Sequence, residues 1–234
     1  MATLARALPR RPGRGAERGR RPCRVRDRRR ATRCRRRYSL PLAATARLRR
    51  RPGPVVTSYS TSGMVEALAR AHGQRVVRGP VGESQIVDLG LAEGAVVAGE
   101  GSGGVAVLPL NVAYDGLLTL GLVLEEMATS GRTLAELAAG LSEPRHAQAR
   151  AAVPAEPRLP GARPLPTPPR QGRRPDCADG VRLAWGDTWL HVRASGTEPL
   201  LRIIAEAPDR VRAEALVEEA TVFARQITSG HEGS

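Results

Sequence analysis

Nine prolines fall between residues 143 and 178, and they separate the chain into two parts that have to fold on either side of them. A proline fixes φ and lacks the backbone N–H, so it breaks helices and interrupts central strands. We therefore expect no regular structure over most of this stretch, and we interpret residues 143–175 as a linker. The sequence then predicts one unit at 54–142 and a smaller one at 176–234.

The first unit alternates short β-branched runs with segments of helical spacing. Strands are expected at 55–60, 75–78 and 95–98, and a helix is expected after each of the first two. This order is typical of a parallel α/β sheet. Ligands of such sheets bind beyond the carboxyl ends of the strands, so the glycine-rich loop 99–104, which follows the third strand, is a candidate binding loop.

Two more helices are predicted at the end of the first unit. Asp115 is a suitable N-cap for the first of them, and Thr133 with Glu136 has the spacing of a capping box for the second. The core face of the first helix is expected to carry Leu117, Leu120, Leu124 and Met127.

The second unit has the pattern of a small α+β domain. Strands at 181–185 and 189–192 flank Gly186 and Asp187, a pair that favours a tight hairpin turn. A third strand is expected at 200–206, and Asp209 is a candidate N-cap for a terminal helix. The fold class is therefore α/β: a partial parallel sheet followed by an antiparallel sheet backed by a helix.

The loop between the last two strands has the chemistry of a phosphate site. Arg193 offers a planar guanidinium that matches phosphate oxygens, and Ser195 and Thr197 offer hydroxyl donors. Gly196 lets the backbone form an anion-holding concavity. By composition alone, an ordinary polar turn with a surface arginine is an equal alternative.

The same loop carries a family resemblance. Arg-Ala-Ser-Gly-Thr-Glu-Pro-Leu-Leu-Arg at 193–202 resembles the phosphate-binding loop in domain 4 of the α-D-phosphohexomutases, which include phosphoglucosamine mutase and phosphomannomutase. Residues 55–62 and 78–83 resemble domain 3 of this family. Residues 99–104 are similar to its sugar-recognition loop, and residues 115–118 to the helix start that follows. These blocks stand in the family's order, so the resemblance implies the C-terminal half of such an enzyme.

The resemblance also implies roles for individual residues. The ligand would be a hexose or hexosamine phosphate, whose sugar hydroxyls would be bound by Glu100 and Ser102. Gly104 stands where relatives often have a histidine, which is a departure within the sugar loop. The residues implied to hold the phosphate are Arg193, Ser195, Gly196 and Thr197.

The family's chemistry also needs a phosphorylated serine and Mg²⁺. Its serine motif, Thr-Ala-Ser-His-Asn-Pro, and its metal motif, Asp-x-Asp-x-Asp-Arg, do not occur in this sequence. Phosphoryl transfer without a nucleophile and a cation would be very slow. We therefore assign no catalytic residue and no metal ligand, and expect the chain alone to be inactive. The leading interpretation is therefore a phosphohexomutase in truncated or damaged form, acting on hexose or hexosamine phosphates. The alternative is a non-catalytic sugar-phosphate-binding fragment, with or without a partner chain that supplies domains 1 and 2.

The positive charge of the sequence is concentrated at its start. Residues 1–51 contain 20 arginines and two acids, out of 37 basic and 23 acidic residues in the whole chain. Such a segment invites a nucleic-acid interpretation, but Tyr38 is its single aromatic residue, which makes base stacking and hence nucleic-acid binding a minor alternative. We expect residues 1–53 to be a disordered tail, although residues 37–44 resemble the helix that enters domain 3. A shifted reading frame over 1–36 and 155–175 is a further hypothesis.

No segment has the length and apolar character of a membrane span, and no apolar region follows the first arginines as in a secretory signal. Cys23, Cys34 and Cys177 lack the spacing of metal ligands, and they suit a reducing compartment. The sequence therefore predicts a cytoplasmic protein with no membrane partner.

Overall fold

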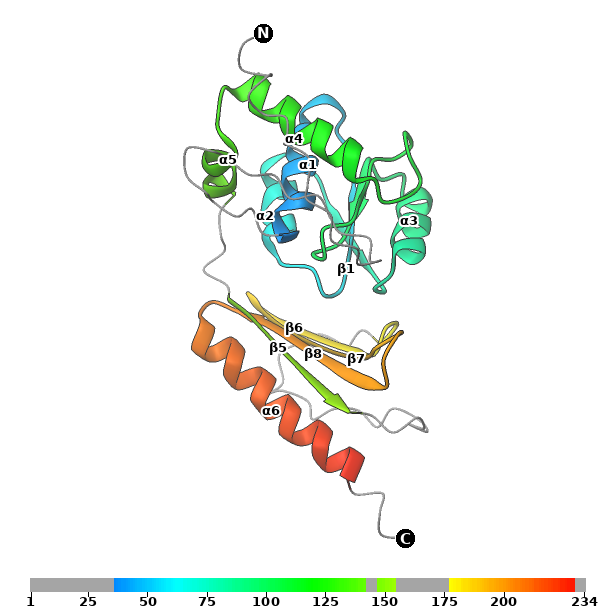
Figure 1. The fold of residues 1–234 in the computed structure, drawn as a ribbon, viewed down its shortest axis with the longest axis vertical. Helices are drawn as coiled ribbons and strands as arrows, with labels where there is room; N and C mark the ends of the chain where they lie inside the picture. Colours follow the sequence, from blue (N-terminus) through cyan, green and yellow to red (C-terminus); the bar gives the residue numbers. More distant parts are fainter. Residues whose placement is uncertain (1–35, 142–146, 155–176, 230–234) are drawn as a thin grey trace, which may run out of the picture.

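The computed structural model describes residues 36–141, 147–154 and 177–229, and these form two units stacked along the long axis of the molecule (Figure 1). The first unit contains the helices η1 (Arg36–Tyr38), α1 (Ser39–Arg50), α2 (Met64–Ala71), α3 (Glu83–Ala92), α4 (Gly116–Ser130) and α5 (Leu134–Gly140). Its strands are β1 (Val55–Ser58), β2 (Val76–Gly79), β3 (Val97–Gly99) and β4 (Val105–Ala106).

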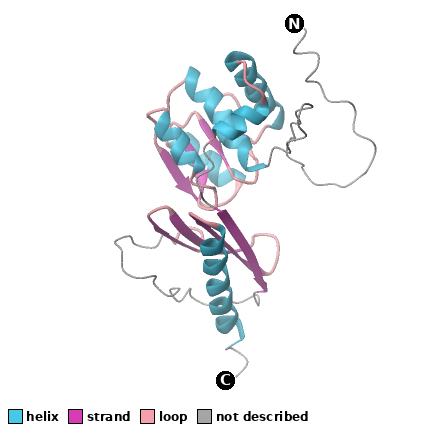
Figure 2. Ribbon diagram, turned by 90° about the vertical axis from the view of Figure 1, so that its left-hand side faces the viewer, coloured by secondary structure: helices cyan, strands magenta, loops and turns pink. Residues whose placement is uncertain are grey.

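The sheet of the first unit has the order β2-β1-β3-β4. The pairs β1–β2 and β1–β3 are parallel, as the sequence predicts, and β4 adds an antiparallel edge. Neighbouring residues of a strand point to opposite faces, so Val55 belongs to the core beneath α1, α2 and α4, and Val56 to the core beneath α3. The sheet is thus covered by helices on both faces (Figure 2).

Helix α1 differs from the expectation of a disordered tail that runs to residue 53. Leu40, Ala43 and Ala44 are fully buried in the core that contains Val55 and Val97. Burial of the apolar face of α1 against the sheet compensates the entropy of ordering a short, arginine-rich segment. Pro41 lies in the first turn, where a helix tolerates proline. Residues 1–35 lie outside the described part of the chain, and with them most of the predicted tail.

Helix α4 begins where the sequence predicts, directly after Asp115, but it buries a different face. The Asp115 carboxylate accepts the N–H groups of two residues in the first turn, at 2.8 and 2.9 Å. Leu117, however, is 82% exposed. This helix is apolar around most of its circumference, so its packing against α1 decides which side is covered. The buried residues of α4 are Thr119, Leu122, Val123 and Glu126.

The second unit is an antiparallel sheet backed by one long helix, which confirms the predicted α+β class. Its elements are β5 (Ala147–Pro154), β6 (Val181–Trp185), β7 (Thr188–Ala194), β8 (Leu200–Ala207) and α6 (Arg210–Ser229), and the strand order is β5-β8-β7-β6. The N–H of Arg212 donates to the Asp209 side chain at 2.8 Å, so Asp209 caps α6 as predicted.

Strand β5 lies inside the stretch that we interpret as a linker. It pairs only with β8, so it is an edge strand, and its proline is the last residue of the strand. An edge strand tolerates the missing N–H of proline. Residues 143–146 and 155–175 of the predicted linker lie outside the described residues.

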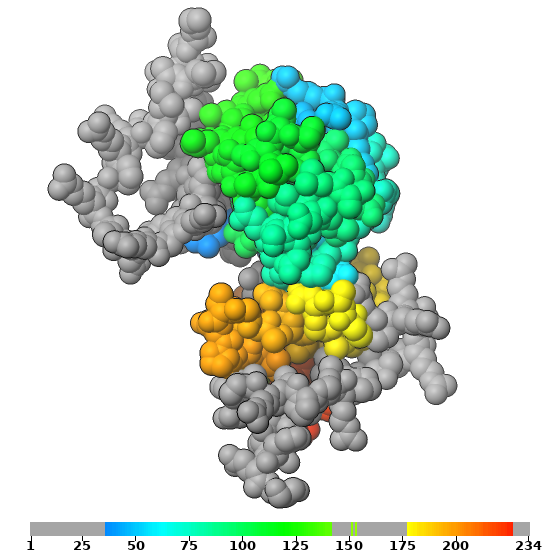
Figure 3. Space-filling model, turned by 90° about the vertical axis from the view of Figure 1, so that its right-hand side faces the viewer, coloured from blue at the N-terminus to red at the C-terminus, as the bar shows by residue number. Residues whose placement is uncertain are grey.

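The two faces of the second sheet have different partners. Leu190, Val192 and Ile203 belong to the core that packs against α6. The residues between them in the strands, such as His191, therefore face the first unit, which sits on the sheet opposite α6 (Figure 1). In the space-filling view the green and cyan first unit rests directly on the yellow strands of the second (Figure 3).

Candidate functional site

The loops that follow β1, β2 and β3 meet at one edge of the parallel sheet. The N–H of Gly101 donates to Thr61 Oγ1 at 3.1 Å, and the N–H of Tyr59 donates to the carbonyl of Gly79 at 2.9 Å. The N–H of Gly82 lies 3.3 Å from Glu100 Oε1. The candidate binding loop 99–104 is therefore tied to both neighbouring loops, and all three face the second unit.

Arg78, at the end of β2, braces this edge of the sheet. Its Nε and Nη2 atoms donate to the two carboxylate oxygens of Glu66 at 2.6 and 2.9 Å. Its Nη1 donates to the carbonyls of Ser58 and Thr61 at 2.7 and 2.8 Å. A bidentate ion pair of this kind is geometrically specific, so it holds the loop after β1 in one conformation.

The two predicted sugar-binding residues occupy different environments. Glu100 is buried, 8% exposed, directly after β3, whereas Ser102 is exposed at the tip of the loop. The Tyr114 ring fills the space beside Gly104, where an added Cβ would lie 2.1 Å from the ring. Burial, and then the nearby Glu100 carboxylate, raise the pKa of the Tyr114 hydroxyl far above its ordinary value. The Tyr114 ring thus occupies the space that a side chain at position 104 would need.

The predicted phosphate loop joins β7 to β8. The Ser195 N–H donates to the carbonyl of Leu200 at 2.8 Å, which closes the loop at its base. Gly196 and Thr197 are exposed at its tip, and nothing lies within 4 Å of a Cβ built on Gly196. The backbone of the loop is thus open to an approaching ligand.

Two arginines flank this loop. Arg193 and Arg202 are direct partners in the register of β7 and β8, so both guanidinium groups start from one face of the sheet. Arg202 forms an ion pair with Glu198, and its Nε donates to Ser195 Oγ at 3.1 Å. Arg193 Nη1 donates to the carbonyl of Ala194, and its Nε is buried without a hydrogen-bond partner among the described residues. Like charges placed opposite each other in a sheet are destabilising unless an anion compensates them.

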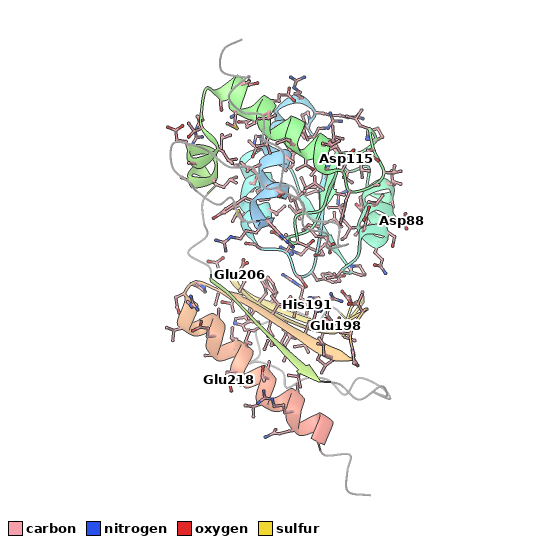
Figure 4. The ribbon with its side chains drawn as sticks, in the orientation of Figure 1. Asp88, Asp115, His191, Glu198, Glu206 and Glu218 are labelled. Atoms are coloured by element: carbon pink, nitrogen blue, oxygen red, sulfur yellow. The ribbon has the colours of Figure 1, made fainter. Side chains whose placement is uncertain are left out.

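Several polar contacts between described residues join the two units. Ser60 Oγ lies 2.8 Å from His191 Nδ1, and the N–H of Val81 donates to Asp179 Oδ2 at 2.8 Å. At the other contacts, Gly63 N–H donates to Glu206 at 2.8 Å and Arg182 Nε donates to the carbonyl of Tyr59 at 3.2 Å. His191 and Glu206 both lie on the face of the sheet that is turned to the first unit (Figure 4).

His191 is a buried, neutral member of this junction. It is 1% exposed, its Nε2 lies 2.7 Å from the carbonyl of Asp179, and the Tyr59 ring meets it edge-on. A carbonyl can only accept, so Nε2 carries the proton and Nδ1 accepts from the Ser60 hydroxyl. Burial lowers the pKa of His191, and the charges of Arg193 and Arg182 lower it further against the opposing effect of Asp179. The structure therefore places His191 as a packed residue.

The predicted site residues thus divide into two groups. Arg193, Ser195, Gly196 and Thr197 share one loop of the second unit, and Glu100 and Ser102 share one loop of the first. The junction between these groups contains Asp179, which the sequence analysis did not single out. Its one sequence signal is the glycine that follows it. That glycine indicates a turn, but it does not indicate a contact with a distant residue.

The described ranges contain no grouping of three or more His, Cys, Asp or Glu side chains that could hold a metal ion. The magnesium implied by the resemblance therefore has no site on these residues. No helix within these ranges has the length and hydropathy of a membrane span.

Known proteins resemble both units. Residues 37–144 match the sequence profile described as phosphoglucomutase/phosphomannomutase, alpha/beta/alpha domain III, and residues 128–221 match that of the C-terminal domain of the same family. A phosphoglucomutase/phosphomannomutase of Thermococcus kodakarensis is 30% identical over 76% of this chain and 39% of its own length. A phosphoglucosamine mutase of Limosilactobacillus fermentum is 35% identical over 75% of this chain and 37% of its own length.

The fold is shared as well. The crystal structure of a phosphoglucomutase/phosphomannomutase family protein from Burkholderia thailandensis superposes with a TM-score of 0.64 at 20% identity. It matches 87% of this chain and 43% of that one. The chain thus spans about two fifths of the length of the curated relatives that it matches.

Proposed function

Because this chain belongs to the phosphoglucomutase/phosphomannomutase family, of which it carries domains III and IV, we propose that it binds a hexose or hexosamine phosphate at the junction of its two units. The phosphate would be held by Arg193 and the loop 195–197. The sugar hydroxyls would be bound by Glu100 and Ser102.

The observation that carries the phosphate assignment is the pairing of Arg193 with Arg202 beside an open loop. Glu198 already compensates part of the charge of this pair through Arg202, and a dianionic phosphate between the two guanidinium groups would compensate more of it and accept charge-assisted hydrogen bonds. Arg202 already orients the Ser195 hydroxyl, so the Ser195 side chain would be preorganised for the same ligand. The ion pair with Glu198 holds the Arg202 guanidinium beside the loop, and Glu198 itself would not contact the ligand.

Glu100 suits a sugar because its carboxylate accepts hydrogen bonds only, and hydroxyls can donate them. Its buried position, with the Gly82 N–H on one oxygen, restricts the rotamers that it can adopt. A restricted acceptor selects hydroxyls by their position on the ring. Ser102, exposed at the loop tip, would add an adaptable donor or acceptor.

Mutase turnover requires the phosphoserine and Mg²⁺ that the family resemblance implies. We propose that another polypeptide segment with domains I and II supplies both, and that domains III and IV of this chain bind and orient the substrate. Mixing the chain with a separately expressed N-terminal half of a relative, in a phosphoglucosamine mutase assay, tests this division. Turnover by the chain on its own would contradict it.

Ligand binding is tested directly by isothermal titration with glucosamine 6-phosphate, mannose 6-phosphate, glucosamine and inorganic phosphate. We expect Arg193→Ala to weaken binding of both sugar phosphates about 10- to 100-fold, the range for one lost charge-assisted hydrogen bond. Arg210→Ala is the matched control, because Arg210 is an exposed arginine paired with Glu214 on α6. Equal losses in the two variants would point to net charge alone and refute the assigned site.

A further inference from the structure

We infer that Asp179 is a positioning residue: its carboxylate and carbonyl clasp the two units together and set the spacing between the sugar loop and the phosphate loop. This inference rests on the proposed function, because it concerns how the two halves of that site are held in register.

The contacts of Asp179 reach both loops through short, continuous paths. On one side, its Oδ2 accepts the N–H of Val81 at 2.8 Å, and the next N–H along the chain, that of Gly82, lies 3.3 Å from Glu100 Oε1. On the other side, its carbonyl accepts His191 Nε2–H at 2.7 Å, and His191 stands two residues before Arg193 in β7. One residue therefore connects the neighbourhood of Glu100 with that of Arg193.

Asp179 is itself held in place by its neighbours. A Cβ built on Gly180 would lie 2.2 Å from the Val192 carbonyl oxygen and 2.7 Å from Arg193 Cα, so residues 179–180 press directly on the end of β7. His191 is fixed from its other edge by the Ser60 hydroxyl, at 2.8 Å. The clasp thus runs from the loop after β2 to β7 through two direct hydrogen bonds, and it can hold the two units at a fixed distance.

A fixed distance matters only to a ligand that spans both loops. A sugar phosphate contacts the phosphate loop and the sugar loop together, so preorganised loops lower the entropic cost of its binding. Inorganic phosphate contacts the phosphate loop alone and gains nothing from the clasp. The ratio of the two affinities is therefore a measure of interdomain positioning that a general loss of stability would not change.

The rest of the junction lets a variant at Asp179 keep its fold. Glu206 and Arg182 make separate contacts to Gly63 and to Tyr59, and each unit has its own core. The matched control is Asp187, an exposed aspartate in the β6–β7 turn. Asp179→Asn is the conservative variant, because its side-chain oxygen can still accept the Val81 N–H.

The experiment uses the full chain and two readouts. The first is titration with inorganic phosphate and with glucosamine 6-phosphate. The second is the distance distribution between spin labels, measured by double electron–electron resonance. The labels would be placed at Leu91 on α3 and Val222 on α6, both exposed, after replacement of all three cysteines by serine.

For Asp179→Ala we expect a broadened interdomain distance, phosphate affinity within about twofold of the parent, and about tenfold weaker sugar-phosphate binding. Asp179→Asn should recover most of that loss, and Asp187→Ala should match the parent. An unchanged distance distribution, or equal loss of both ligands, overturns the inference. If the parent binds no sugar phosphate, the proposed function fails, and the spin-label distances alone then test the clasp. A broader distance distribution in Asp179→Ala than in the parent would support the clasp, and an unchanged distribution would reject it.

Discussion

A methyl group added at Gly180 would test how tightly residues 179–180 are packed against β7. Gly180 has φ +74°, in the left-handed region that disfavours every residue with a Cβ, and the new methyl group would meet backbone atoms of Val192 and Arg193 at 2.2 and 2.7 Å. Gly186, in the β6–β7 turn, has a similar φ of +55° but no atom within 4 Å of its added Cβ. The pair separates backbone strain from steric contact.

The expected magnitudes follow from this difference. The left-handed conformation costs an alanine about 1–2 kcal/mol, which is the whole effect expected for Gly186→Ala. Gly180→Ala adds overpacking against backbone, about 1–3 kcal/mol more, for a total of about 2–5 kcal/mol. With a urea m-value of about 2 kcal/mol per M, the two midpoints should differ by roughly 0.5–1.5 M.

Urea unfolding followed by tryptophan fluorescence is a suitable assay, because both tryptophans of the chain, Trp185 and Trp189, lie in the β6–β7 hairpin and report on the second unit. We also expect Gly180→Ala to weaken phosphate binding, since relief of the clash must shift Arg193. Equal midpoints for the two glycine variants would refute the close packing of residues 179–180 on β7.

Three further predictions concern single side chains. Burial lowers the pKa of the folded-state His191 below 6.5, so the unfolded chain binds a proton at this histidine more tightly than the folded chain does. Acidification from pH 7 to pH 5 should therefore destabilise the parent more than the His191→Gln variant. Urea midpoints at each pH measure this difference. Ile203→Ala truncates a fully buried side chain in the core beneath α6 and should lower the unfolding free energy by about 2–5 kcal/mol. Val211→Ala, at a 78% exposed position, should change the unfolding free energy by less than about 0.5 kcal/mol. Similar losses in both variants would contradict the assignment of Ile203 to the core. Thr133→Ala breaks the capping box of α5 and should cost about 1 kcal/mol with faster amide exchange confined to that helix, and exchange that is unchanged there would show that the cap has no such role.

Local signals in the sequence predicted local structure well. The Thr133–Glu136 capping box forms as expected, with both of its hydrogen bonds present, and Gly186 with Asp187 makes the predicted hairpin turn. Such features depend on contacts within three or four residues, which the sequence displays directly. The period-two alternation of β7 likewise places Leu190 and Val192 in the core and leaves His191 for the opposite face.

Features that depend on distant partners could not be predicted in this way. The prolines around 147–154 argued against a strand, yet β5 forms because an edge position beside β8 needs no N–H from its last residue. The apolar residues of α4 surround most of the helix, so only packing against α1 decides that Leu122 is buried and Leu117 exposed. Ordered residues 39–50 depend equally on the sheet face that they cover.

The sequence by itself therefore determined the chemistry of the two loops, since Arg193, Ser195 and Glu100 carry their donors, acceptors and charges wherever they lie. Only the tertiary structure decided how the two units that carry these loops meet. Their alignment depends on Asp179, whose hydrogen bonds to Val81 and His191 span 98 and 12 residues of sequence. Contacts of that range have no local pattern, because they form only when two separately folded units meet.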